Sequence, residues 1–376
     1  MKRPDPYRLL FPIGLTYGIL GAGLWPLHAL GVLEYPGIAH RRLMIQGFEQ
    51  CFVLGFLLTA MPGITKGPPC HPLELAVAVG TAVSFGIAVA WGAWQVSAVA
   101  FAASMGLLMV ALARRLGPSR APRPMELLFV GFGLVMGMLG SARQMVGGGI
   151  DGVADAWISL GMVLSLVLGL GSLLVPTFTG MKSPLTIPGI AAPHESGRRA
   201  LLYAVLIAAL ASAFAFEELG RPRTGAFIRA GTATVMIILV WKLIRPPGHR
   251  DAPAFAMWSS GWFIVLGLWI VALAPPLRLG GLHVVFIGGF ALLTLGIGTR
   301  VLVAHGGYPP AEERTVLSPL LVATVLLTLA ARLIAEAMPS RVGLWLAISG
   351  GLWVFGWLAW AFRAMPRLAG SPKART

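Results

Sequence analysis

Charged residues are scarce in this 376-residue chain, where Asp, Glu, Lys and Arg make up only 11% against 57% hydrophobic residues. No soluble domain of this length has enough interior to bury so much apolar surface, which excludes a soluble globular protein. The apolar runs lack the short alternation of barrel strands, and they are long enough to cross a hydrocarbon layer of roughly 30 Å as helices. The composition therefore predicts an all-α integral membrane protein whose main partner is the lipid bilayer.

Cysteine and the common catalytic motifs are also scarce. Cys51 lies inside an apolar run and Cys70 in the predicted loop after it, so the two do not indicate a disulfide. The sequence has no Walker-type phosphate loop, no HExxH zinc motif, no paired-cysteine metal spacing and no nucleophile elbow. Basic residues are scattered between the apolar runs, so the net charge of +15 indicates membrane topology rather than nucleic-acid binding.

Twelve apolar runs have the length of a membrane-spanning helix. They lie near residues 9–32, 41–62, 74–94, 96–113, 126–146, 155–175, 200–216, 224–244, 254–274, 281–303, 315–335 and 343–364. With a cytoplasmic N-terminus, twenty of the 29 Lys and Arg residues fall at cytoplasmic ends and eight at outer ends. This bias predicts that both termini are cytoplasmic. We expect a single membrane domain over residues 1–376, with its longest cytoplasmic loop at about residues 176–199.

Two of these spans share a design in which a histidine opens an apolar helix and a basic group closes it. His40 opens the second span and His283 opens the tenth, and the topology places both near the outer face together with His28. Two facing histidines can ligate a haem iron from opposite sides. His40 and His283 are therefore the candidate metal ligands, and His28 is a third ligand or a supporting group. Met44 shares the helical face of His40 and is a further cofactor-binding candidate.

Arginines on the same outer side are candidate partners for haem propionates. Arg41 and Arg42 go against the inward charge bias, and Arg143 and Arg278 lie on the same side. Glu49 follows His40 by nine residues, which is about half a turn away around an α-helix, so we expect it to face another neighbour.

Other polar residues have a simpler interpretation. Arg332 and Glu336 are four residues apart and are expected to form a structural pair. Arg300 and His305, at the inner end of the tenth span, either bind an anion or anchor the helix at the interface.

Alternative functions stay open at this level. Histidines at helix ends also cap or snorkel to the interface, and Gly47, Gly288 and Gly289 leave room either for a flat group or for a close helix contact. Polar residues in several spans and Gly/Pro interruptions also fit a transporter or channel in which the histidines are structural. A third alternative is an assembly factor for another membrane metalloprotein.

Three blocks of sequence occur in order along the chain: GFEQCFVLGFLLTAMPGITKGPP (47–69), LLVPTFT (173–179) and LHVVFIGGFALLTLGIGTRVLVAHGGYP (282–309). They resemble GF…GFLLTAVPNWTGRPP, LLPxFT and HALTVGAIGTMxLxVMTRxxLGHTGRP of the NnrS family, membrane proteins linked to nitric oxide stress and described as containing haem and copper. The third block matches in register at His283, Thr299, Arg300, His305 and Gly306. The resemblance thus marks Arg300 and His305 as family-motif residues.

The resemblance implies a multi-pass protein of the bacterial inner membrane that acts in the response to nitric oxide or nitrosative stress. It implies haem as cofactor, nitric oxide as a gas ligand, and redox chemistry at the iron as the candidate enzymatic activity. The family usually has an HAHE cluster where this chain reads HRRL at residues 40–43, and a further family histidine falls at Ser259. With fewer ligands, a single haem fits better than a haem–copper centre, and retention of copper is left open.

A looser likeness concerns subunit I of the haem–copper oxidases. There, too, histidines open the second and tenth of twelve spans on the outer side. The copper ligands of the sixth and seventh oxidase helices have no counterpart in this chain, whose sixth and seventh predicted spans contain no histidine. Oxygen reduction coupled to proton pumping is therefore not expected.

Overall fold

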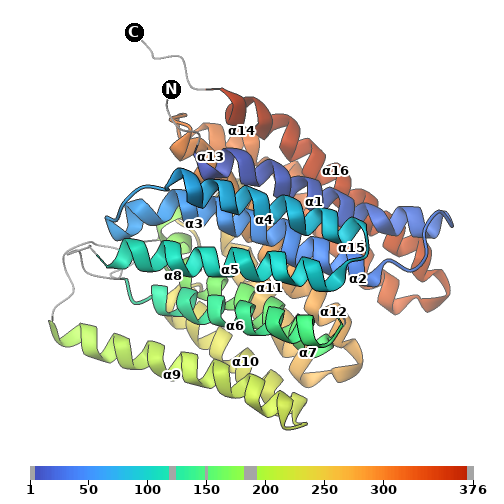
Figure 1. Cartoon of the computed structure of the whole chain (residues 1–376), viewed down its shortest axis with the longest axis horizontal. Helices are drawn as coiled ribbons and strands as arrows, with labels where there is room; N and C mark the ends of the chain where they lie inside the picture. Colours follow the sequence, from blue (N-terminus) through green and yellow to red (C-terminus); the bar gives the residue numbers. More distant parts are fainter. Residues whose placement is uncertain (1–4, 118–123, 149–150, 182–192, 371–376) are drawn as a thin grey trace.

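The computed structural model describes residues 5–117, 124–148, 151–181 and 193–370. Within these ranges twelve helical spans are long and apolar enough to cross a membrane, and no strand occurs. The spans lie roughly alongside one another in one bundle (Figure 1). These observations confirm the all-α, twelve-span fold class that the composition predicts.

Seven spans are uninterrupted α-helices, and an eighth adds a short 3-10 turn, η6 (Pro339–Arg341), before its helix. In chain order the helices are α1 (Pro6–Ala29), α4 (Pro72–Ala90), α5 (Trp94–Leu116), α6 (Leu127–Val146), α9 (Pro193–Glu218), α11 (Ala252–Leu273), α15 (Pro319–Ala337) and α16 (Val342–Ala369).

The other four spans each contain a π-helical segment. The second span is α2 (Gly37–Arg41), η1 (Arg42–Glu49) and α3 (Gln50–Thr65); the sixth is α7 (Gly152–Ala156), η2 (Trp157–Val163) and α8 (Leu164–Phe178); the eighth is α10 (Pro222–Val235) and η3 (Met236–Val240); the tenth is η4 (Pro275–Leu277), α12 (Arg278–His283), η5 (Val284–Ala291) and α13 (Leu292–His305). A π-helix closes its hydrogen bonds from i to i+5 and so has a wider turn than an α-helix. Residues beyond such a segment are therefore rotated about the axis from the direction that an α-helical period predicts.

Local sequence signals account for several helix starts. At α4, the amide of Leu73 donates to His71 Nδ1 at 3.2 Å and the amide of His71 donates to Glu74 Oε2 at 2.9 Å, which forms a reciprocal capping box. At α11, the amide of Ala254 donates to Asp251 Oδ1 at 3.1 Å. These contacts satisfy N–H groups that have no partner inside the helix.

Most span boundaries differ from the sequence prediction by a few residues, and two of the differences concern the second span and the longest loop. The second span continues past Pro62 to Thr65 and ends at Lys66, whose φ of 54° is left-handed. Residues 193–199, predicted as part of the longest loop, belong to α9, and residues 182–192 of that loop lie outside the described residues. The predicted break near Gly92–Gln95 is confirmed, because α4 ends at Ala90 and α5 begins at Trp94.

Sequence neighbours form antiparallel pairs, such as α4 with α5, α9 with α10 and α15 with α16, and α1 packs between α3 and α16. Figure 1 shows the start of α1 and the end of α16 at one end of the bundle, and α2, α7 and α12 at the other. We call these the termini end and the far end. An even number of spans requires this arrangement, while the cytoplasmic location of the termini stays a prediction.

Candidate functional site

A cavity of about 780 Å³ lies toward the far end of the bundle. Its walls come from α1, α2, η1, α7, η2, α12, η5, α15 and α16. The volume falls within the range of roughly 300–1,000 Å³ typical of small-molecule and cofactor sites. Tyr35, which is 74% exposed, and exposed Arg41 belong to the lining and place the mouth of the cavity at the surface. Three of the four π-helical segments among the described residues contribute wall residues, and π-helical turns are frequent at functional sites.

The two histidines singled out in the sequence line this cavity from different spans. His40 Nδ1 lies 2.8 Å from the carbonyl oxygen of Gly21 on α1, and His283 Nδ1 lies 2.8 Å from that of Leu279 on α12. Since a carbonyl oxygen only accepts, Nδ1 carries a proton in both rings, and in the neutral form of each ring Nε2 keeps its lone pair. A backbone contact of this kind is what orients metal-bound histidines in proteins.

Aromatic rings surround the first histidine. The ring centroid of Trp25 lies 5.3 Å from that of His40, 6.2 Å from that of His28 and 5.6 Å from that of Tyr35, each in an edge-on arrangement. His28 Nδ1 in turn lies 3.0 Å from the carbonyl oxygen of Leu33. Sequence reasoning missed Trp25 and Tyr35, although Trp25 precedes His28 by three residues and so shares its helical face.

The residues that follow the two histidines divide between the cavity and helix packing. Met44 lines the cavity beside His40. A Cβ on Gly288 would lie 2.6 Å from Phe263, one on Gly289 2.5 Å from Ile264, and one on Gly47 3.0 Å from Tyr17. Of the two uses that the sequence leaves open for these glycines, the structure therefore supports close contact with α11 and α1.

Two adjacent arginines predicted as propionate partners have different positions. Arg41 lines the cavity, with its Nη1 2.8 Å from Asp155 Oδ2 on α7. Arg42 is buried, lies outside the lining, and donates to Gln144 Oε1 at 2.8 Å. Consecutive residues of a helix point in different directions, which explains why only one of them reaches the cavity.

Arg143 also lies outside the lining. It pairs with Asp151, and its Nη1 lies 2.9 Å from Glu218 Oε1 on α9. Asp151 Oδ1 accepts from the amides of Val153 and Ala154 at the start of α7. Burial raises the pKa of Asp151, but the hydrogen bonds from Arg143 and from the two amides outweigh it and leave the pKa below its ordinary value. Arg143 thus joins the α6–α7 connection to α9.

Two other arginines line the cavity instead. Arg332 Nη1 lies 3.9 Å from Glu336 Oε2, which confirms the pair predicted from their spacing. Arg278 forms no ion pair with another residue in the described ranges. Arg278, one of the predicted propionate partners, thus lines the cavity as Arg41 does, and Arg332 is a further lining residue.

Glu49 corrects one expectation. It lines the cavity together with His40, only 6% exposed, and the Thr294 hydroxyl of α13 donates to its Oε2 at 2.9 Å. The expectation of a different face assumed an α-helix. Residues 42–49 form the π-helical segment η1, whose wider turn brings position 49 round to the side of position 40.

The family-motif residues of the third block lie at the termini end, outside the cavity. Arg300 pairs with Glu313 of α14 (Glu312–Val316), and its guanidinium carbon lies 5.0 Å from the ring centroid of Phe178. Burial raises the pKa of Glu313 above its ordinary value, although Arg300 opposes the shift. The His305 ring lies 6.2 Å from that of Tyr7. These contacts support an anchoring role.

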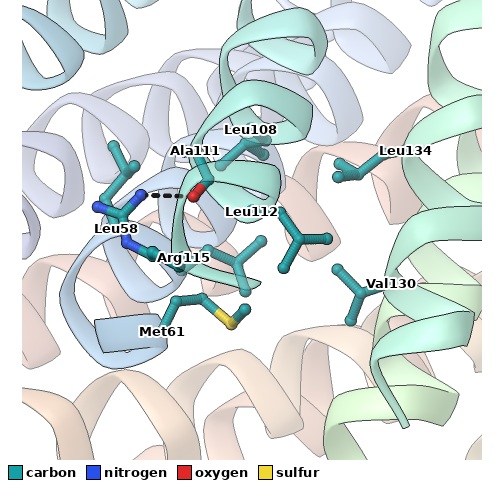
Figure 2. Close-up of a pocket in the computed structure, with 9 residues that line it drawn as sticks. Leu58, Met61, Leu108, Ala111, Leu112, Arg115, Val130 and Leu134 are labelled. Carbon is teal, nitrogen blue, oxygen red and sulfur yellow. Dashed lines mark hydrogen bonds between the residues drawn. The ribbon is translucent and has the colours of Figure 1, made fainter. Parts of the chain in front are cut away.

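A second hollow, between α3, α5 and α6 at the termini end, has a volume of only about 10 Å³. Figure 2 shows its apolar lining, including Leu58, Leu108 and Leu134. Arg115 reaches back along α5 and donates to the carbonyl oxygen of Ala111 at 2.7 Å. This space is about one water molecule in size.

The metal-binding capacity of the large cavity follows from its donor set. Within the described ranges, no group of three or more His, Cys, Asp or Glu side chains could hold a metal ion by itself. A haem makes a smaller demand, because the porphyrin supplies four nitrogen ligands and the protein supplies the axial ones. Two neutral imidazoles, a largely apolar wall and the basic groups of Arg41 and Arg278 fit such a group.

Comparison with known proteins identifies the family of the chain. The model of the NnrS protein family matches residues 4–371, which include all twelve spans and every cavity-lining residue named above. No curated protein matches the chain. Since the match covers nearly the whole length, this multi-pass membrane protein belongs to the NnrS family.

Proposed function

We propose that the chain binds one haem in the cavity at the far end, with His40 and His283 as its two axial ligands. One observation carries the proposal: both imidazoles line the same cavity, and a backbone carbonyl holds the Nδ1 proton of each ring. Both Nε2 lone pairs are therefore available to a metal. A bound haem would supply single-electron exchange and an affinity for diatomic gases.

The surrounding side chains have separate roles in this proposal. Arg278 and Arg41 would hold the carboxylates of the porphyrin at the mouth of the cavity, where charge-assisted hydrogen bonds are strongest for arginine. Trp25 and Phe286 pack beside the two histidines and would exclude water from the iron. His28 supports the Trp25 side of the site. The proposal does not include copper, because the described residues contain no group of three or more His, Cys, Asp or Glu side chains that could hold a metal ion.

The role in nitric oxide stress that the sequence resemblance implies would be carried out at this iron. Membership of the NnrS family and a cavity walled by membrane-spanning helices support that role. We place the protein in the bacterial inner membrane with the far end outward, as the charge bias indicates.

The test is the optical spectrum of the detergent-purified protein, oxidised and reduced, for the wild type, His40→Ala, His283→Ala and His305→Ala. We expect a Soret band in the wild type and a haem affinity at least about tenfold lower in the first two variants, because even supporting groups of metal ligands have effects of this size. His305→Ala is the matched control, since its ring lies at the termini end, and should bind haem like the wild type.

Two outcomes would contradict the proposal. A wild-type protein that stays colourless after growth with haem would favour the transporter, and transport assays on vesicles would then come next. A Soret band that is indifferent to both cavity histidines would place the haem elsewhere.

A further inference from the structure

Glu49 stands apart from the other carboxyl groups of the cavity. Of the three that the described lining contains, Asp155 lies 2.8 Å from Arg41 and Glu336 lies 3.9 Å from Arg332. Glu49 has a hydroxyl for a partner and forms no ion pair within the described residues. Glu49 is therefore the one carboxyl group of the described lining that has no cation beside it.

The depth of Glu49 makes this lack of a cation costly. It lies near the middle of the 29-residue span Gly37–Thr65 and is 6% exposed. An ionised carboxyl inside a membrane requires a partner or a compensating positive centre. A protein keeps such a group where the charge of the site changes during function.

The other charged groups of the described lining are the pairs Arg41–Asp155 and Arg332–Glu336 and the single Arg278. Arg278 precedes Thr294, the partner of Glu49, by sixteen residues of one span, or roughly 24 Å along a helix. His28 and Tyr35 lie on the exposed side of the Trp25 cluster. The two candidate ligand histidines each donate from Nδ1 to a backbone carbonyl and carry no charge in their neutral form.

We propose that Glu49 is the proton-exchanging residue of the site. This inference rests on the proposed haem site. Glu49 is protonated when the cavity holds no positive centre and ionised beside ferric iron. It would take up one proton from a hydronium ion of the solvent at the mouth of the cavity when a haem bound there gains one electron from an external one-electron donor.

The step balances in charge and in atoms. One O–H bond of the hydronium ion would break and leave a water molecule, and one O–H bond would form at the carboxylate oxygen that does not accept from Thr294, while the external donor supplies the electron. The net charge of the cavity is the same before and after. Thr294 positions the carboxyl, because its hydroxyl donates to Glu49 Oε2 at 2.9 Å.

A first experiment measures the protonation state of Glu49 in the absence of haem. Infrared spectra of the haem-free protein in detergent at neutral pH should contain the C=O stretching band of a protonated carboxylic acid. The band should disappear in Glu49→Gln, shift in Thr294→Val and persist in Glu336→Gln, a cavity carboxyl with a cationic partner. A wild-type band that neither Glu49→Gln nor Thr294→Val alters, or the absence of any band, overturns the proposal.

A second experiment measures the coupling to reduction. The midpoint potential of the haem-loaded wild type should fall by about 59 mV for each unit that the pH rises. This shift corresponds to a tenfold change in the equilibrium constant of a one-electron couple. Glu336→Gln should keep this slope and Glu49→Gln should lose it. A full slope in Glu49→Gln overturns the inference while a normal Soret band upholds the haem site; a colourless wild type overturns both.

Discussion

The two ends of the helical bundle differ in how they accommodate charge. At the termini end, Arg115 Nη2 lies 2.9 Å from Glu74 Oε2 beside a hollow of only about 10 Å³, and Arg300 pairs with Glu313. At the far end, the lining of a cavity of about 780 Å³ includes two ion pairs and also Glu49, beside which the described residues provide no cation. Because unpaired polar groups inside a membrane are costly, the comparison indicates that the termini end uses charge for stability and the far end retains it for function.

Three of the four π-helical segments of the described residues lie toward the far end, whereas η3 closes the eighth span at the termini end. The second, sixth and tenth spans have their π-helical segments η1, η2 and η5 toward the far end and continue as regular α-helices, α3, α8 and α13, toward the termini end. Wider turns re-aim side chains into a cavity, whereas regular turns pack closely. The functional difference between the two ends is thus built into the helices themselves.

The largest expected effect on stability comes from removing a buried ion pair at the termini end. Glu74→Ala leaves Arg115, whose side chain is 1% exposed, without a counter-ion inside the bundle. Removal of one partner of such a pair costs about 3–5 kcal/mol of unfolding free energy. Thermal unfolding in detergent should show a large fall in melting temperature with an unchanged haem spectrum below it.

The matched control for that variant is Glu218→Ala. Glu218 forms a half-exposed pair with Arg143, so its loss should cost about 0–1 kcal/mol. Equal melting temperatures for the two variants would contradict the idea that the termini end depends on its buried pairs.

A smaller effect is expected where a cavity-bearing span contacts α11. In Gly289→Ala the new Cβ would lie 2.5 Å from Ile264 Cγ1, and such overpacking costs about 1–3 kcal/mol. Gly231→Ala on α10 has open space at the same position and should be neutral or stabilising by up to about 1 kcal/mol. Melting temperatures provide the comparison, and a stable Gly289→Ala protein would mean that α11 and η5 can separate without loss.

The smallest effect on stability is expected at the mouth of the cavity. Arg278→Gln removes a charge that forms no ion pair in the described ranges, so the unfolding free energy should change by less than about 0.5 kcal/mol. Haem titrations should nonetheless show weaker binding, by roughly tenfold to a hundredfold, since a charged hydrogen bond contributes about 1.5–3 kcal/mol.

Arg143→Gln is the control for haem affinity, because Arg143 lies outside the lining and pairs with Asp151 and Glu218. If Arg143→Gln lost affinity for haem and Arg278→Gln kept it, the assignment of the residues that bind the haem carboxylates would be reversed.

Much of the architecture can be predicted from the sequence, because a membrane span is recognised from the mean hydropathy of consecutive residues. The break at Gly92 and the pair Arg332–Glu336 depend only on near neighbours, and both are confirmed. The direction of Glu49 is wrong when an α-helical period is assumed, because η1 changes the turn. Likewise, which arginine reaches the cavity depends on partners far along the chain, such as Gln144 for Arg42.

The sequence by itself determined the membrane class, the twelve spans, the family resemblance and the choice of His40 and His283 as candidate ligands. Composition and spacing carry these because each is a local property of the chain. Only the tertiary structure decided that the two histidines line one cavity, that Glu49 joins them, and that the glycines serve helix packing. The reason is physical: the rotation of a helix and the groups that face it follow from contacts between spans, which no single stretch of sequence contains.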